Sequence, residues 1–233
     1  MNNFKLSVII PCFNEEKTIA KIIEQVSANE DIVHEIIIVD DNSSDRSKKI
    51  ITDLSKINKK IKFHFKDKNE GKGSALIKGF ELTTGEIIII QDADLEYDPS
   101  EYKKLLKPFL TSNADVVYGS RFLGGDMVRL SFFWHFLANK ILTFICNLVT
   151  NLNMSDMETG YKLIKKKHLD KIKLREKSFG IEPELTVKLA KMNLVFYEVP
   201  ISYKGRTYLQ GKKIGLKDAF VALLCIFKYK FFN

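Results

Sequence analysis

The chain has few cysteines, three among 233 residues, and they stand far apart at Cys12, Cys146 and Cys225. This spacing excludes a disulfide framework and a zinc-binding pattern, and it fits a reducing cytosol. No stretch of about 20 residues is apolar enough to span a bilayer, and the first residues lack the apolar region of a signal peptide. Internal repeats, low-complexity segments and a clear linker are also missing. We therefore expect a cytoplasmic protein that folds as one large domain.

Negative charge is in deficit, because 37 Lys and Arg residues outnumber 29 Asp and Glu residues and give a formal net charge of +8. A positive excess favours anionic partners such as nucleotides, phospholipids or nucleic acids. The sequence contains no recognised nucleic-acid-binding motif, so we do not expect a nucleic-acid partner. Hydrophobic residues make up 45% of the chain, which is ordinary for a globular protein and excludes disorder of the whole chain.

Short apolar runs alternate with helical patterns through the first half of the chain. Strands are expected at Leu6–Ile10, Ile36–Val39, Ile61–Phe65 and Ile87–Ile90. Helices are expected over residues 14–26, 46–57 and 74–82. The second half adds an expected strand at Val116–Arg121, a helix at Glu182–Met192 and a strand at Val195–Tyr203. This alternation predicts an α/β fold with a mostly parallel sheet flanked by helices.

Acidic residues follow the fourth of these strands, where residues 91–98 read Q-D-A-D-L-E-Y-D. Residues two apart on an extended chain face the same side, so Asp92, Asp94 and Glu96 can point the same way. Packing gives no reason for carboxylates there, whereas a hard divalent cation takes oxygen ligands, usually one or two carboxylates plus substrate phosphates. The pattern predicts a metal site, and the alternative is a solvated acidic loop.

Polar loops also follow the first two strands, with the sequences P-C-F-N-E-E and D-D-N-S-S-D. Ligands of such sheets bind beyond the carboxyl ends of the strands, where these loops converge. The alternative for Asp41 to Ser44 is a helix cap. Gly71-Lys72-Gly73 permits close approach of the backbone to a ligand and offers a charge to a phosphate, but alone it also fits a plain turn.

Four motifs, in this order and spacing, resemble those of family-2 glycosyltransferases with a GT-A fold: L-S-V-I-I-P-C-F-N-E-E, I-I-I-V-D-D-N-S-S-D, N-E-G-K-G-S-A and I-I-I-I-Q-D-A-D-L-E. The resemblance covers nearly the whole chain and extends to dolichyl-phosphate mannose synthases and bacterial polyprenyl-phosphate glucosyltransferases. It implies an inverting, metal-dependent transfer of a sugar from GDP-mannose or UDP-glucose to a polyprenyl phosphate. It also implies one GT-A domain, with a nucleotide-sugar and metal part over residues 1–115 and an acceptor and membrane part over residues 116–233.

The resemblance also assigns residues to these roles. The metal, Mg²⁺ or Mn²⁺, falls to Asp92, Asp94 and Glu96. The nucleotide sugar falls to Pro11, Phe13, Asn14, Glu15, Asp40, Asp41, Gly71, Lys72, Asp92, Ala93, Arg206 and Lys212. Catalysis falls to Asp94, Arg121 and Asp156. Phe13 stands where relatives often carry Tyr, and Glu96 where many carry Gln, which leaves the choice of metal open.

Two acceptor-side residues carry distinct expectations. Arg121, in the motif G-S-R-F, suits an acceptor phosphate because its guanidinium binds oxyanions in two places. Asp156 stands where an inverting transferase would hold a base, but a phosphomonoester is largely ionised at neutral pH and needs positioning more than deprotonation. The alternative for Asp156 is a loop cap. Glu182 and Glu184, in F-G-I-E-P-E-L, fit the same subgroup without a definite role.

Two apolar segments, Ser131–Thr150 and Ala219–Phe227, contain aromatic residues interrupted or followed by polar ones. They predict amphipathic helices lying at a membrane surface, and the alternative for the first is a core helix. We expect a peripheral protein at the cytoplasmic face of the membrane, with a possible membrane-anchoring partner. Two other functions are alternatives to transfer onto a lipid. One is transfer of the sugar to a surface glycan, and the other is a non-catalytic subunit that binds nucleotide sugars.

Overall fold

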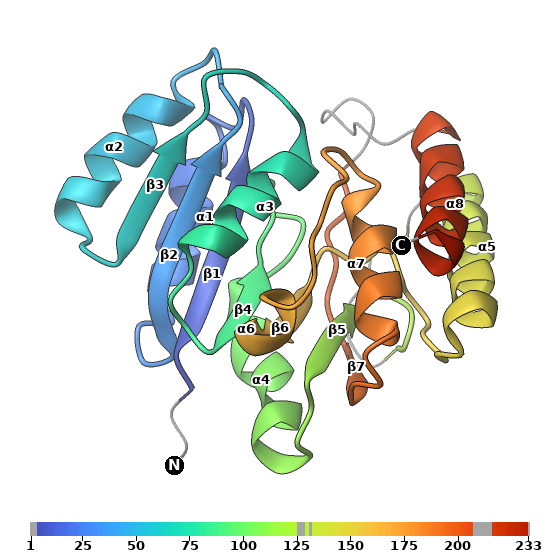
Figure 1. Cartoon of the computed structure of the whole chain (residues 1–233). Coiled ribbons are helices and arrows are strands. Elements are labelled where there is room, and N and C mark those ends of the chain that lie inside the picture. Colours follow the sequence, from blue (N-terminus) through green and yellow to red (C-terminus); the bar gives the residue numbers. More distant parts are fainter. Residues whose placement is uncertain (1–3, 125–128, 131, 207–215, 233) are drawn as a thin grey trace.

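The computed structural model describes residues 4–124, 129–130, 132–206 and 216–232. Within these residues, seven strands form one sheet in the order β3-β2-β1-β4-β6-β5-β7 (Figure 1). The strands are β1 (Leu6–Cys12), β2 (Val33–Asp40), β3 (Ile61–Phe65), β4 (Ile87–Ile90), β5 (Val116–Ser120), β6 (Lys162–Lys165) and β7 (Phe196–Pro200). All the described strand pairs are parallel except those of β6, which runs antiparallel to β4 and β5. The predicted α/β fold with a mostly parallel sheet is confirmed.

Helices cover both faces of the sheet (Figure 1). They are α1 (Ile19–Ser27), α2 (Ser47–Ile57), α3 (Lys72–Leu82), α4 (Tyr102–Thr111), α5 (Phe133–Thr150), α6 (Lys166–Leu169), α7 (Ile181–Ala190) and α8 (Leu216–Phe231), with a 3₁₀ turn, η1, at Pro99–Glu101. Side chains of α1 and α4 join the hydrophobic cluster on one face, and those of α3, α5, α7 and α8 join the cluster on the other. The core therefore consists of two layers separated by the sheet.

The four consecutive isoleucines of β4 supply both layers. Ile87 and Ile89 belong to the first cluster, whereas Ile88 and Ile90 belong to the second. Successive side chains of a strand point to opposite faces, so a central strand covered on both sides needs apolar residues throughout. Burial of each such side chain stabilises the fold by about 1.5–3 kcal/mol.

The first helix begins later than the sequence pattern suggests. It was expected from Asn14, but α1 begins at Ile19, and Asn14 itself has a φ of 55°. The intervening loop is bound to the loop after β2 instead: the amide of Asn14 donates to Ser43 Oγ (2.8 Å) and the amide of Glu15 to Ser47 Oγ (3.0 Å). These contacts fix the loop beyond β1 and prevent its backbone from starting the helix.

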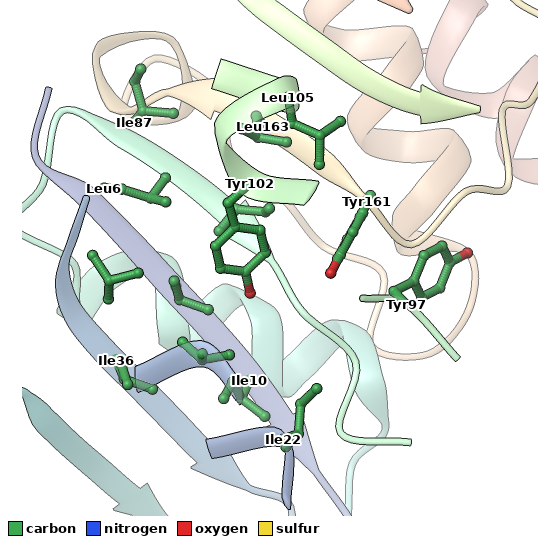
Figure 2. Packing of buried hydrophobic residues seen from close by; sticks show 14 of the residues in the cluster. Leu6, Ile10, Ile22, Ile36, Ile87, Tyr97, Tyr102, Leu105, Tyr161 and Leu163 are labelled. Atoms are coloured by element: carbon green, nitrogen blue, oxygen red, sulfur yellow. The ribbon is translucent and has the colours of Figure 1, made fainter. Parts of the chain in front are cut away.

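The sequence pattern did not identify β6 and α4. β6 is only four residues long and lies in a lysine-rich segment, where Lys162 is fully buried. Its strand character depends on the space between β4 and β5, which no local pattern reveals. α4 buries Tyr102 against Tyr161, with ring centroids 6.0 Å apart, and Tyr161 in turn packs on Tyr97 (4.7 Å), as Figure 2 shows. This cluster of three tyrosines packs against the acidic loop, to which Tyr97 itself belongs.

Helices α5 and α8 pack side by side at one edge of the molecule (Figure 1). α5 buries only Leu142, Thr143 and Cys146, so the alternative of a core helix applies to a small part of its surface. The membrane contact expected of this amphipathic helix stays a prediction. In the part of the chain that the structure describes, no helix is both long and apolar enough to cross a membrane.

Candidate active site

The carboxyl ends of β1, β2, β4, β5 and β7 lie at the same edge of the sheet, because β6 is the reversed strand among them. The segments beyond these ends line one cavity of about 310 Å³. The sequence-predicted residues that line it are Pro11, Phe13, Glu15, Asp41, Gly71, Lys72, Asp92, Ala93, Asp94, Glu96, Arg121 and Arg206. Asn14, Asp40 and Asp156 are not among the lining residues, and Lys212 lies outside the described residues.

Asp92 and Asp94 each contact a basic side chain in this cavity. Lys72 Nζ lies 2.7 Å from Asp92 Oδ1, and Arg206 Nη2 lies 2.9 Å from Asp94 Oδ2. Burial, followed by the negative charges of Asp92 and Glu96, raises the pKa of Asp94 to about 7. Crowded carboxylates of this kind gain from a cation placed among them, because the cation favours their charged form.

The donor set of this acidic loop fits a divalent metal. Mg²⁺ and Mn²⁺ prefer oxygen ligands, and Asp92 and Asp94 offer carboxylate oxygens on the cavity wall. Across the described residues, however, no group of three acidic, histidine or cysteine side chains is already gathered as a ligand set. Lys72 and Arg206 already contact these two carboxylates, so a metal would have to displace both side chains from Asp92 and Asp94.

Glu96 is bound to the segment that follows β7. Its Oε2 accepts from the hydroxyl of Tyr203 (2.7 Å), and its Oε1 accepts from the backbone amide of Arg206 (2.7 Å). Its backbone carbonyl accepts from the amide of Lys204 (2.9 Å). The segment 203–206 is thereby held against the acidic loop, although more than 100 residues separate the two in sequence.

Lys72 connects Asp92 to Glu182, which also lines the cavity, and through it to the buried Lys162. Lys72 Nζ also lies 3.3 Å from Glu182 Oε1, and Glu182 Oε2 accepts from Lys162 Nζ (2.5 Å). Burial alone would lower the pKa of Lys72, but the charges of Asp92 and Glu182 raise it above its ordinary value. Glu182, which had no role from sequence, therefore helps to keep Lys72 charged and in place.

Glu184 has a structural role in the same helix. It is fully buried, and its carboxylate accepts from the backbone amides of Arg175 (2.9 Å) and Glu176 (2.7 Å). Its Oε1 also lies 2.7 Å from Lys188 Nζ, one turn further along α7. These bonds hold the segment before α7, which forms part of the cavity rim at Ser178.

Asp41 fixes the glycine loop rather than capping a helix. Its carboxylate accepts from the backbone amide of Gly71 (2.6 Å) and from Lys66 Nζ (2.7 Å). Helix α2 has Arg46 at its N-cap without a side-chain cap, so the helix-cap alternative is wrong for Asp41. Gly71 has a φ of 101°, a conformation that L side chains rarely adopt, and this explains a glycine at this position.

Arg121 and Asp156 form a two-pronged ion pair. Arg121 Nε lies 2.7 Å from Asp156 Oδ2, and Nη2 lies 2.7 Å from Asp156 Oδ1. Asp156 is fully buried, and burial would raise its pKa, but the charge of Arg121 and its hydrogen bonds hold the pKa of this carboxyl below its usual value. Asp156 is thus an ionised support for Arg121, which itself lines the cavity.

Glu158 is a cavity residue that the sequence reasoning missed. Within the described part of the chain, its Oε1 is buried without a hydrogen-bond partner. Burial, opposed by the charge of Lys162 and increased by that of Glu182, raises the pKa of Glu158 to about 7. In the sequence, only its position two residues after Asp156 pointed to Glu158. The charged side chains that surround it, Lys162 and Glu182, come from β6 and α7.

Comparison with known proteins adds a family match. The sequence profile described as glycosyl transferase family 2 matches residues 7–173. The chain is 29% identical to a dolichol-phosphate mannosyltransferase of Pyrococcus furiosus over 90% of its own length and 60% of that protein. It is 30% identical to an uncharacterized protein of Methanocaldococcus jannaschii over 88% of its own length and 93% of that protein. It is also 30% identical to the low-salt glycan biosynthesis hexosyltransferase Agl6 of Haloferax volcanii, over 86% of its own length and 48% of that protein.

Solved structures show the same fold. Glucosyl-3-phosphoglycerate synthase of Mycobacterium tuberculosis, in complex with Mn²⁺, UDP and phosphoglyceric acid, superposes with a TM-score of 0.77 at 17% identity, covering 99% of this chain and 80% of that one. The same synthase with Mg²⁺ and UDP superposes with a TM-score of 0.75 at 18% identity, covering 97% of this chain and 79% of that one. The sheet and helices described above therefore match the GT-A fold.

Proposed function

The chain belongs to glycosyl transferase family 2, and from this premise we propose that it transfers a hexosyl group from a nucleotide sugar to a polyprenyl phosphate. One observation carries the proposal: a carboxylate pair suited to a metal diphosphate and an arginine suited to a phosphate line the same cavity. The similarity to the dolichol-phosphate mannosyltransferase of Pyrococcus furiosus supports a lipid phosphate acceptor, although the chain aligns with only 60% of that protein. The complexes of the structural neighbours with UDP and Mn²⁺ or Mg²⁺ support a nucleotide-sugar donor.

The donor would lie along the strand ends. The nucleoside would contact the end of the cavity formed by Pro11, Phe13 and Asp41, and its diphosphate would reach the acidic loop. Asp92 and Asp94 would hold Mg²⁺ or Mn²⁺, whereas Glu96, the third ligand predicted from the sequence, already accepts from Tyr203 and Arg206. The bound metal would neutralise the diphosphate and make it a better leaving group.

The acceptor phosphate would be held by Arg121. A phosphomonoester is largely ionised at neutral pH, so its oxygen can attack the anomeric carbon without a base. The new bond from phosphate oxygen to carbon forms as the bond from carbon to the diphosphate oxygen breaks, which inverts the configuration and releases the nucleoside diphosphate. Asp156 would orient Arg121 for this attack, because both of its oxygens are bound to that guanidinium.

A lipid acceptor requires contact with a membrane, and the paired helices α5 and α8 offer it. We define their apolar face by its exposed side chains: Phe133, Trp134, Phe136, Ile141, Phe144, Leu148, Phe220, Val221, Leu224, Phe227 and Phe231. Such a face, flanked by Lys228 and Lys230, fits the headgroup boundary of an anionic bilayer. We propose peripheral attachment at the cytoplasmic face of the membrane, with or without a membrane-anchoring partner.

The decisive experiment supplies purified protein with Mn²⁺ or Mg²⁺, a short polyprenyl phosphate, and labelled GDP-mannose or UDP-glucose in parallel. The expected result is label in the organic phase from one donor, and its loss in Asp94→Asn. Release of nucleoside diphosphate without lipid label would instead favour a glycan acceptor. Absence of both products in the presence of either metal would contradict the proposed transfer from these donors.

A further inference from the structure

Arg206 contacts three carboxylates of the cavity at once. Its Nη2 lies 2.9 Å from Asp94 Oδ2, its Nη1 lies 3.4 Å from Glu15 Oε1, and its Nε lies 3.4 Å from Glu96 Oε1. These groups are mostly buried, with side-chain exposures of 13–21%. Charge–charge contacts are stronger in such surroundings than at an open surface. The guanidinium is therefore a firmly held cation at the position where a divalent metal would meet Asp94.

Glu96 anchors the backbone that carries this arginine. Both of its carboxylate oxygens already have protein donors, namely the Tyr203 hydroxyl and the Arg206 amide, each at 2.7 Å. A metal ligand at this position would have to give up one of these bonds. Asp92 and Asp94 each contact a side-chain cation instead, Lys72 and Arg206, and exchange of either contact for a metal breaks no bond to the backbone.

We propose that Glu96 positions Arg206 rather than completing the metal site, and that Arg206 occupies the metal's place at Asp94 until a divalent cation and a diphosphate bind together. This inference rests on the proposed function, because it concerns the same donor site. It assigns the metal to Asp92 and Asp94 and gives Arg206 two successive partners, carboxylates first and diphosphate second.

Charge explains why the two ligands should bind as a pair. A divalent cation that binds alone must displace the guanidinium from Asp94, its shortest carboxylate contact, and leave it only the longer contacts to Glu15 and Glu96. A diphosphate offers the displaced guanidinium a two-pronged contact, for which arginine is well suited. Each ligand therefore raises the affinity of the site for the other, and by linkage the two increases are equal.

The test measures Mn²⁺ binding directly, from the electron paramagnetic resonance signal of free Mn²⁺, with and without UDP or GDP. In Arg206→Gln, the Kd for Mn²⁺ alone should fall about fivefold to tenfold, because the competing cation is gone, while the Kd for the nucleoside diphosphate should rise. Tyr203→Phe keeps the ring and the charge but removes the bond to Glu96, so it should lower the Kd for Mn²⁺ alone by a smaller factor. Arg175→Gln, at an exposed arginine, is the matched control and should change neither constant.

Several outcomes would overturn the inference. Weaker or unchanged binding of Mn²⁺ alone in Arg206→Gln would show that Arg206 does not compete with the metal. A loss of Mn²⁺ affinity in Glu96→Ala as large as that in Asp94→Ala would show that Glu96 is a ligand; the anchor role predicts a much smaller change. Failure of the unaltered protein to bind Mn²⁺ even with UDP or GDP would instead contradict the metal-dependent function itself.

Discussion

Arg121 holds Asp156 with two nitrogens, Nε and Nη2, each 2.7 Å from a different carboxylate oxygen. Asn139 also donates to Asp156 Oδ1 (3.3 Å), so this carboxylate is surrounded by donors. A general base needs an oxygen within reach of the proton that it removes. Asp156 is fully buried and does not line the cavity, whereas Arg121 does. We therefore expect Asp156 to position the Arg121 guanidinium rather than to act as a base.

The first prediction concerns this pair in the transfer reaction. Arg121→Lys should lower kcat/KM for the polyprenyl phosphate by about 100-fold, equivalent to ~2.7 kcal/mol. Lysine cannot make the two-pronged contact with Asp156 that holds the Arg121 guanidinium in place. Asp156→Asn should lower kcat/KM by about tenfold through a rise in the acceptor KM, and the double variant should be no worse than Arg121→Lys alone. Initial rates at varied acceptor concentration provide the measurement. A loss of kcat in Asp156→Asn that is greatest at high pH, where a base would be deprotonated, and that shrinks at low pH with KM unchanged, would indicate a base instead.

The second prediction concerns Gly160, which passes close to the acidic loop. A Cβ there would lie 2.6 Å from Asp92 Oδ2 and 2.8 Å from a ring carbon of Tyr97. Gly160→Ala should push the Asp92 carboxylate aside and weaken Mn²⁺ binding in the presence of nucleoside diphosphate by about tenfold, or ~1.4 kcal/mol. Calorimetric titration with Mn²⁺ provides the measurement.

Gly79 provides the control for this substitution. A Cβ at Gly79 would lie 2.5 Å from a methyl group of Ile9 in the core, away from the cavity. Gly79→Ala should lower the free energy of unfolding by about 1–3 kcal/mol, as overpacking does, without changing the Kd for Mn²⁺. Equal effects of the two variants on Mn²⁺ binding would refute a specific role of Gly160.

The third prediction concerns the apolar face of α5 and α8. Trp134 and Phe144 are 73% and 62% exposed, and each would transfer its side chain from water to lipid on membrane contact. The double variant Trp134→Ser, Phe144→Ser should reduce binding to vesicles of anionic phospholipid by at least about tenfold, since each large apolar side chain contributes ~1.5–3 kcal/mol when buried. Co-sedimentation with the vesicles provides the measurement.

A matched control exists on other faces of the molecule. Ile57 and Leu110 are also exposed, at 83% and 55%, but they belong to α2 and α4. The double variant Ile57→Ser, Leu110→Ser should bind vesicles like the unaltered protein. If both double variants lose binding to the same extent, the apolar face of α5 and α8 is not the membrane contact.

The sequence predicted the part of the site that depends on local patterns. Runs such as Ile87–Ile90 indicate buried parallel strands, and the topology of a parallel sheet brings the residues after such strands to one edge. Asp92, Asp94 and Asp41 could therefore be placed together in advance, and the structure brings all three to one cavity. Their roles as metal and nucleotide-sugar ligands stay predictions.

Pairings between distant segments could not be predicted in the same way. Arg206 meets Glu15 across 191 positions of sequence, and Lys72 meets Glu182 only because α7 packs behind the glycine loop. Glu158 acquires its environment from β6, a strand of four residues whose antiparallel position follows from its neighbours. These features depend on the assembled sheet and leave no periodic pattern in the chain.

The last prediction concerns stability and pH, and it follows from Glu158. The pKa of this group is about 7 in the folded protein against an ordinary value of 4.5, chiefly because burial disfavours the charged form. Between these two values the folded state binds the proton and the unfolded state does not, so the free energy of unfolding falls as the pH rises from about 4.5 to 7.

Glu158→Gln cannot ionise, so its free energy of unfolding should not show this fall. Between pH 4.5 and pH 8, the stability of the variant relative to the unaltered protein should therefore rise by about 1–3 kcal/mol. Urea unfolding of both proteins at the two pH values provides the measurement, with Glu81→Gln, an exposed glutamate on α3, as the control that should show no such change. A stability difference between Glu158→Gln and the unaltered protein that is the same at both pH values would mean that Glu158 is ionised in the folded state.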